Sequence, residues 1–143
     1  MLNGLTYRYS GDIEKANPLL LDSKQEFEAL LQQHDDGYAI IRSLCFITAG
    51  LGDLDGARRY CEKALKVAPK DEFVAGNVKF DSAAGLALAG DAQGSVRVLK
   101  AMLEADMGPT IYRVIYHPAF DGIRADAAYI ELLEQYGPEG KQP

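Results

Sequence analysis

The sequence predicts an all-α protein built from stacked antiparallel helical hairpins. Apolar residues recur at three- and four-residue steps along much of the 143-residue chain, as on one face of an α-helix. No stretch alternates β-branched and polar residues as a strand would. Gly-Asp pairs stand between the periodic stretches, at Gly11-Asp12, Gly52-Asp53 and Gly90-Asp91. Because glycine tolerates the left-handed conformation that ends a helix and aspartate caps the next helix, each pair predicts a tight turn between two helices.

The first Gly-Asp pair is followed by a helix that contains Pro18. Two positions for this helix remain open. It starts near Asn17, because proline is tolerated in the first turn, or it breaks at Asp22, since Ser23 and Glu26 fit a capping box.

Four further helices flank the second and third Gly-Asp pairs. They are predicted over residues 38–51, 54–68, 74–89 and 92–106. Pro69 stops the second of them within a turn of its end. Each helix turns one apolar stripe toward its neighbours, and the stripes comprise Ile41, Leu44, Cys45, Thr48, Leu54, Ala57, Cys61, Ala64, Leu65, Ala68, Val78, Ala83, Leu86, Ala87, Ser95, Val96, Leu99, Met102 and Leu103.

A repeat of about 40 residues between Gly-Asp pairs is typical of stacked helical hairpins. The middle unit carries Leu44-Cys45-x2-Thr48, Gly52-Asp53, Ala57-x3-Cys61-x2-Ala64 and Pro69. This unit resembles the tetratricopeptide repeat family, whose pattern is W-x2-L-G-x2-Y, then A-x3-F, then A and P. The outer units match less well: the first reads Asn3-Gly4-x2-Tyr7, Gly11-Asp12 and Ala16, and the third reads Ser82-Ala83-x2-Leu86, Gly90-Asp91 and Ser95-x3-Leu99-x2-Met102 without a closing proline.

The resemblance implies a superhelix of about three repeats over residues 1–108. Gly4 falls where the middle of a family helix would be, so the first unit is truncated and the chain is expected to be the C-terminal part of a longer repeat protein. Residues 109–143 are expected to form a C-terminal loop and capping helix. The segment 116–137 is similar to one that closes many bacterial repeat proteins, and Tyr129, Leu132, Leu133 and Tyr136 would bury one face of its helix.

Family members bind ligands in a concave groove lined by the first helix of each hairpin. The leading hypothesis is therefore a protein–protein interaction module that binds a peptide or partner domain of mixed apolar and acidic character. The alternative is a structural or regulatory repeat domain of a longer protein that acts by intramolecular packing or as a homodimer. The groove residues implied by the resemblance are Arg8, Tyr9, Ala39, Arg42, Phe46, Asn77, Phe80 and Ala84.

Arg42 is notable among them because it interrupts an otherwise apolar helix. A buried arginine needs a partner, so Arg42 is expected to reach a carboxylate, either within the chain or on a ligand. Phe46 and Phe80 are the expected aromatic anchors.

Composition disfavours several other function classes. The net charge is −6, whereas nucleic-acid and anionic-membrane binders are usually basic. We found no stretch of about 20 apolar residues and no secretory leader, so a cytoplasmic protein is expected.

Catalysis, a cofactor and a metal site are not expected from the residues. His34 stands before Asp35 and Asp36, but adjacent side chains point in different directions and are better explained as a solvated helix end. His117 precedes a proline and is expected to bond the backbone. Cys45 and Cys61 lie on facing helices, where a disulfide is conceivable, but two buried thiols are the favoured expectation in a reducing compartment.

Overall fold

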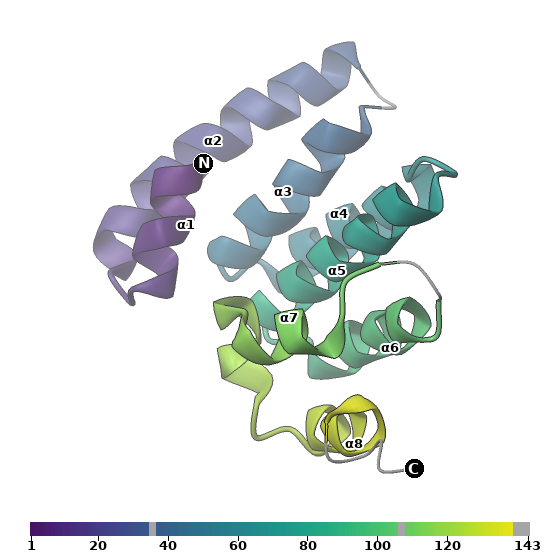
Figure 1. Ribbon diagram of the computed structural model, residues 1–143. Coiled ribbons are helices and arrows are strands. Elements are labelled where there is room, and N and C mark those ends of the chain that lie inside the picture. Colours follow the sequence, from purple (N-terminus) through teal and green to yellow (C-terminus); the bar gives the residue numbers. More distant parts are fainter. Residues whose placement is uncertain (35–36, 106–107, 139–143) are drawn as a thin grey trace.

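The computed structural model describes residues 1–34, 37–105 and 108–138 (Figure 1). Within these ranges the regular structure is entirely helical, which confirms the predicted all-α class. The α-helices are α1 Leu2–Tyr9, α2 Ile13–Gln33, α3 Tyr38–Gly50, α4 Leu54–Val67, α5 Glu72–Leu88, α6 Ala92–Leu103, α7 Ile111–Tyr116 and α8 Ala127–Tyr136, with a 3-10 helix η1 over Pro118–Ile123.

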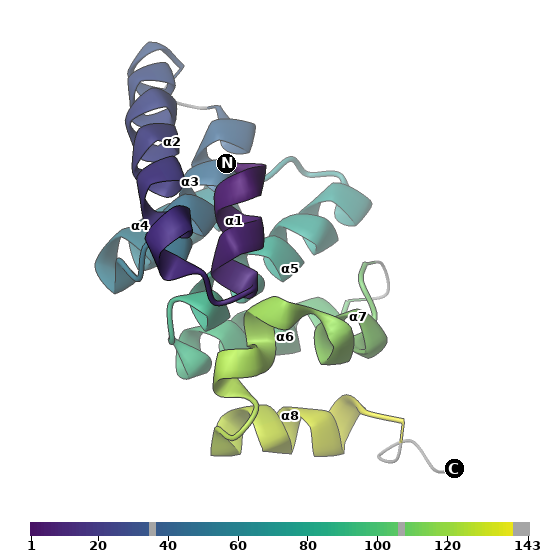
Figure 2. The ribbon, with the colours of Figure 1, turned by 90° about the vertical axis from the view of Figure 1, so that its left-hand side faces the viewer.

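The helices pack as two layers. In one layer α1 contacts α3, α3 contacts α5, and α5 contacts η1. In the other, α2 packs against α1 and α3, α4 against α3 and α5, α6 against α5, and α8 against α6. The hairpin α1–α2 and helix α8 therefore lie at opposite ends of the molecule, as both views show (Figures 1 and 2).

The three Gly-Asp turns have the predicted geometry. Gly11, Gly52 and Gly90 have φ angles of 83°, 74° and 90°, in the left-handed region. At the second turn the N–H of Gly52 donates to the Ala49 carbonyl and the N–H of Asp53 to the Thr48 carbonyl, which is the Schellman arrangement. Asp12, Asp53 and Asp91 then accept backbone N–H groups in the next helix. The same local chemistry thus ends one helix and starts the next three times.

The structure corrects both expectations for the proline-containing helix. Helix α2 is continuous from Ile13 to Gln33, so it neither starts near Asn17 nor breaks at Asp22. The Asp12 cap fixes its first turn, and Pro18 leaves only the exposed Glu14 carbonyl without its helical N–H partner.

Two other helix boundaries differ from the prediction by two residues or more. Helix α5 begins at Glu72, two residues earlier than expected, because the Asp71 side chain caps it by accepting the Val74 N–H. Helix α6 ends at Leu103, whereas the prediction extended to Asp106, which lies outside the described residues. Asp35 and Asp36 also lie outside them, while His34 is exposed and is the C-cap residue that follows α2.

The predicted stripes form the core. Most of their members are buried, and those of α3 to α6 join residues of α7, η1 and α8 in one large cluster. A second, small cluster consists of Leu5, Ala16, Leu20 and Ile47, and it joins α1 and α2 to α3. The half-buried side chains of Tyr9, Phe27 and Phe46 pack against both clusters, so the two cores touch along α3.

The C-terminal segment contains more helices than the loop and single capping helix that the sequence predicted. Its first part folds into α7 and η1, and η1 packs on α5. On α8, Tyr129 and Leu132 are fully buried, while Leu133 and Tyr136 are half-buried against the core. This segment therefore extends both layers: η1 lies against α5 and α8 against α6.

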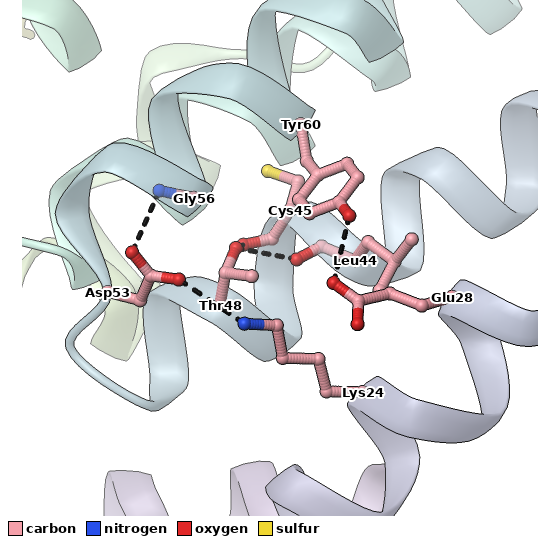
Figure 3. Close-up of polar contacts among 8 residues, drawn as sticks. All are labelled: Lys24, Glu28, Leu44, Cys45, Thr48, Asp53, Gly56 and Tyr60. Carbon is pink, nitrogen blue, oxygen red and sulfur yellow. Dashed lines mark hydrogen bonds and ion pairs between the residues drawn. The ribbon is translucent and has the colours of Figure 1, made fainter. Parts of the chain in front are cut away.

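Polar contacts join α2 to the middle hairpin (Figure 3). The Tyr60 hydroxyl donates to the Glu28 carboxylate at 3.0 Å, and Lys24 Nζ lies 3.5 Å from Asp53 Oδ2. One hairpin further along the stack, Arg58 of α4 donates a hydrogen bond to Asp91, the cap of α6, at 2.6 Å. In both cases the aspartate that caps an outer helix also receives a basic side chain from the preceding outer helix.

Candidate functional site

Polar side chains from four first-layer segments converge on Asp81. The set joins Tyr9 at the end of α1, Arg42 on α3, Asp81 on α5 and Arg113 on α7. Each helix contributes one residue because α1, α3, α5 and the α7–η1 segment follow one another in the same layer. We refer to Tyr9, Arg42, Asp81 and Arg113 as the Asp81 cluster.

Arg42 finds an internal carboxylate, which answers the alternative left open by its sequence. Its Nε lies 3.0 Å from Asp81 Oδ2. The Arg42 side chain is nevertheless 43% exposed, whereas that of Asp81 is 13% exposed. The carboxylate is therefore the buried partner, and the guanidinium lies at the surface where it can also contact a ligand.

Arg113 is held beside the same carboxylate. Its Nη1 donates to the Asn77 side-chain oxygen at 3.0 Å, and its Cζ lies 4.1 Å from the centre of the Phe80 ring. These contacts fix the plane of a guanidinium on an exposed residue. The sequence prediction missed Arg113, although it interrupts the apolar stretch Ile111–Tyr116 just as Arg42 interrupts its helix.

Burial and charge shift the protonation of this cluster. Burial raises the pKa of the Asp81 carboxyl, and the positive charges of Arg42 and Arg113 oppose that shift. Burial, together with the Asp81 charge, raises the pKa of the Tyr9 phenol to about 12. The Tyr9 phenol therefore keeps its proton and is uncharged at neutral pH.

An aromatic wall stands beside the Asp81 cluster. The His117 ring makes edge contacts with Tyr9, Phe80 and Phe120, with centroid distances between 5.3 and 6.2 Å. His117 Nδ1 accepts the Ala119 N–H, the backbone bond expected from the sequence, and this bond requires Nδ1 to be unprotonated. Burial and then the charge of Arg113 lower the pKa of His117, opposed by Asp121. His117 therefore acts as a neutral packing and capping group.

The predicted groove residues divide into two groups. Tyr9, Arg42, Asn77 and Phe80 come together around Asp81 or Arg113, as described above. Arg8 and Phe46 are half-buried, and Ala39 is exposed near the start of α3.

Phe80 and Ala84 have no exposed surface. A partner cannot touch them in this conformation, because η1 packs on α5 and the rings of His117 and Phe120 cover Phe80. The sequence predicted Phe80 as an aromatic anchor for a partner, whereas in the structure its buried ring packs against the Arg113 guanidinium.

Exposed aromatic residues stand on α7 instead. Tyr116 is 79% exposed and Tyr112 is 54% exposed. Tyr116 follows Arg113 by three residues, so the two side chains share one side of the helix. Large exposed aromatic rings beside arginine are typical of interface hot spots, and sequence reasoning overlooked them because it treated this segment as a loop.

The two cysteines are joined, which corrects the expectation of two buried thiols. A disulfide links Cys45 on α3 to Cys61 on α4, and the Cα atoms are 4.8 Å apart. Both residues are fully buried. The expectation failed because it rested on compartment, whereas the hairpin brings the two Cβ atoms close and Gly85 leaves room for both sulfurs. Burial also shields the bond, because a reductant must reach a sulfur atom.

The described ranges contain neither a metal-binding cluster nor a membrane-spanning helix. No group of three or more His, Cys, Asp or Glu side chains there is arranged to hold a metal ion. None of the helices in the described part combines the length and the apolar character needed to cross a bilayer.

Comparison with known protein families, with curated proteins and with solved structures found no match for this chain.

Proposed function

We propose that this chain is a protein-interaction module that binds an acidic segment of a partner on the face formed by α1, α3, α5 and α7. The observation that carries the proposal is the Asp81 cluster, where Arg42 pairs with the Asp81 carboxylate and the charge of Arg113 also acts on it. The nearby carboxylate of Asp121 is paired with Arg124 at 2.8 Å, so it does not neutralise the second arginine. One unmatched positive charge on a protein of net charge −6 favours an anionic ligand group at this place.

The ligand chemistry follows from the two arginines and the tyrosine beside them. A partner carboxylate, from Asp, Glu or a chain end, can accept from Arg42 and Arg113, since guanidinium pairs with carboxylate in a planar geometry. Tyr116 offers an exposed ring for an apolar neighbour in the same segment. The proposed function is non-covalent binding in the cytoplasm, with no metal or cofactor.

The architecture we propose for this module is a tetratricopeptide-like stack with α8 as its cap. Three observations support it: the repeated glycine-aspartate turn, the two alternating helix layers, and the position of α8 on α6. In such a stack the first helix of each hairpin lines the ligand face, and the Asp81 cluster draws its side chains from those helices.

The test uses peptides selected from a displayed library of random and C-terminal sequences. We expect selected peptides to contain carboxylates, and we expect Arg42→Gln or Arg113→Gln to weaken their binding about tenfold or more, since each removes a charged hydrogen-bond donor. Fluorescence anisotropy measures the affinities. Arg97→Gln is the matched control, because Arg97 is 70% exposed on α6 and lies 3.8 Å from its only described partner carboxylate, Glu62.

Circular dichroism first establishes that each variant is folded. Selected peptides without acidic residues, or equal binding by wild type and both cluster variants, would contradict the proposal.

One observation favours a second function, self-association or packing within a longer protein. The hairpin α1–α2 leaves Leu2 75%, Leu19 38% and Leu21 49% exposed. Apolar side chains at the end of a stack are candidates for an interface with a second copy or another domain. Sedimentation velocity over a range of concentrations tests self-association. A dimer that dissociates in the Leu21→Glu variant supports it, and a monomer at every concentration excludes it.

A further inference from the structure

The disulfide lies where three helices meet. Cys45 comes from α3 and Cys61 from α4, and Gly85 of α5 faces both sulfurs. A Cβ atom at Gly85 would lie 2.5 Å from Cys45 Sγ and 3.0 Å from Cys61 Sγ. The distance to Cys45 Sγ is too short for a real Cβ atom and the distance to Cys61 Sγ is unusually tight, so the backbone of α5 packs directly on the disulfide.

This contact is one turn away from the Asp81 cluster. Arg42 precedes Cys45 by three residues on α3, and Asp81 precedes Gly85 by four residues on α5. Residues three or four apart lie on the same side of a helix. The Arg42–Asp81 ion pair and the Cys45–Gly85 contact are therefore successive layers of the same α3–α5 interface.

We infer that the redox state of Cys45 and Cys61 regulates the Asp81 cluster by setting the spacing of α3 and α5. The reductant is a dithiol. It passes two electrons and two protons to the pair, the Cys45–Cys61 bond breaks to give two thiols, and the two sulfurs of the reductant form a disulfide. That the Asp81 cluster is a binding site rests on the proposed function. The coupling between the disulfide and the Arg42–Asp81 ion pair does not.

The direction of the effect follows from volume. Two thiol sulfurs must lie at van der Waals distance, which is longer than a covalent bond, so the reduced pair occupies more space. The backbone at Gly85 already touches both sulfurs, so α5 moves away from α3 on reduction. The ion pair, with Nε and Oδ2 only 3.0 Å apart in the next layer, then opens. The oxidised form is the one with an ordered cluster.

Burial makes this a slow switch. Both cysteines are 0% exposed, so a dithiol reaches them only when α5 opens away from α3 and α4. Each redox state consequently persists between openings.

The first experiment needs no partner. Mass spectrometry of the alkylated chain under non-reducing conditions should find no free thiol, and two after incubation with dithiothreitol at a temperature near unfolding. Nuclear magnetic resonance then follows the Arg42 side-chain N–H in both forms. We expect the exchange of this proton with water to be on the order of tenfold faster in the reduced form. Two free thiols in the untreated protein, or equal exchange rates, would overturn the inference.

Two variants distinguish crowding of the thiol sulfurs against Gly85 from simple loss of the Cys45–Cys61 crosslink. Cys45→Ala with Cys61→Ala removes both sulfurs and leaves space, so slow exchange at Arg42 should persist although the crosslink is gone. Gly85→Ala should lower the thermal midpoint of the oxidised protein but be tolerated in the double-alanine background. Gly122→Ala is the control, because nothing lies within 4 Å of a Cβ there. Fast exchange in the double-alanine variant, or equal effects of Gly85→Ala in both backgrounds, would refute the crowding mechanism.

The peptides selected for the proposed function give a separate measurement. Tighter binding by the oxidised form extends the inference to ligand affinity. If exchange at Arg42 responds to reduction but no peptide binds either form, the proposed function fails and the coupling stands.

Discussion

The N-terminal hairpin and the central stack are built from the same turn but have very different cores. Helices α3 to α8 share one large cluster that includes Phe80, Phe120 and Tyr129. Helices α1 and α2 are held to α3 by four buried residues, Leu5, Ala16, Leu20 and Ile47, and α2 leaves several leucines exposed. Identical capping chemistry therefore sets where helices start and stop, while the amount of buried apolar surface sets how firmly each hairpin is held.

The central stack should respond as one unit to loss of a large side chain. Phe80→Ala removes a fully buried ring that contacts His117, Phe120 and Arg113, and is expected to lower the free energy of unfolding by about 3–5 kcal/mol. Urea denaturation followed by circular dichroism measures this change. Phe73→Ala on the same helix is the control, since Phe73 is 60% exposed and should change stability by no more than about 0.5 kcal/mol. A loss below about 1 kcal/mol for Phe80→Ala would show that the stack is not cooperative around this ring.

The N-terminal hairpin should respond locally. Leu20 is fully buried, and its side chain lies against Gly4 of α1 and Gly50 of α3. We expect Leu20→Ala to lower stability by about 2–3 kcal/mol and to speed amide exchange in α1 and α2, while α5 and α6 stay protected.

Hydrogen–deuterium exchange with mass spectrometry resolves the helices in this test. Leu21→Ala provides the neighbouring exposed control. Uniform acceleration across α1 to α8 would mean that the two clusters form one cooperative core.

The smallest expected difference concerns the aspartates that link successive outer helices. Both Asp53 and Asp91 cap a helix, but only Asp91 also makes a short hydrogen bond, at 2.6 Å, with an arginine. We therefore expect Asp91→Ala to lower the free energy of unfolding by about 1–2 kcal/mol and Asp53→Ala to lower it by about 1 kcal/mol. The hydrogen bond from Arg58 is the main cause of the lowered pKa of Asp91, whereas the Gly56 N–H is the main cause for Asp53.

The pH dependence of these two contributions has a definite sign. Since both pKa values are lowered from 3.8 in the folded chain, each carboxylate stabilises the fold above pH 3.8, and this contribution is lost as the pH falls below it. Thermal unfolding of wild type and both variants between pH 3 and pH 7 measures the loss. A larger effect at Asp53 than at Asp91 would reverse the comparison.

Much of the fold could be predicted from the sequence because it depends on local chemistry. A glycine that adopts positive φ, an aspartate that caps the next helix and apolar residues three or four apart all act within one or two turns of chain. Gly52 and Asp53 are an example, since the structure shows both of their predicted roles. The boundaries of α2 were missed because Pro18 allowed several local solutions, and packing of Leu20 on α1 and α3 favours the continuous helix.

By itself, the sequence determined helices α3 to α6, the three glycine-aspartate turns and most of the buried stripes, and it singled out Arg42. Only the tertiary structure decided that Asp81 is the partner of Arg42, that Arg113 rests on a buried Phe80, and that Cys45 and Cys61 are bonded beside Gly85. These contacts join residues 16 to 40 positions apart, so no local periodicity encodes them. They exist because the stacking of α3, α4, α5 and α7 brings distant side chains to one place, where burial and charge select which of them pair.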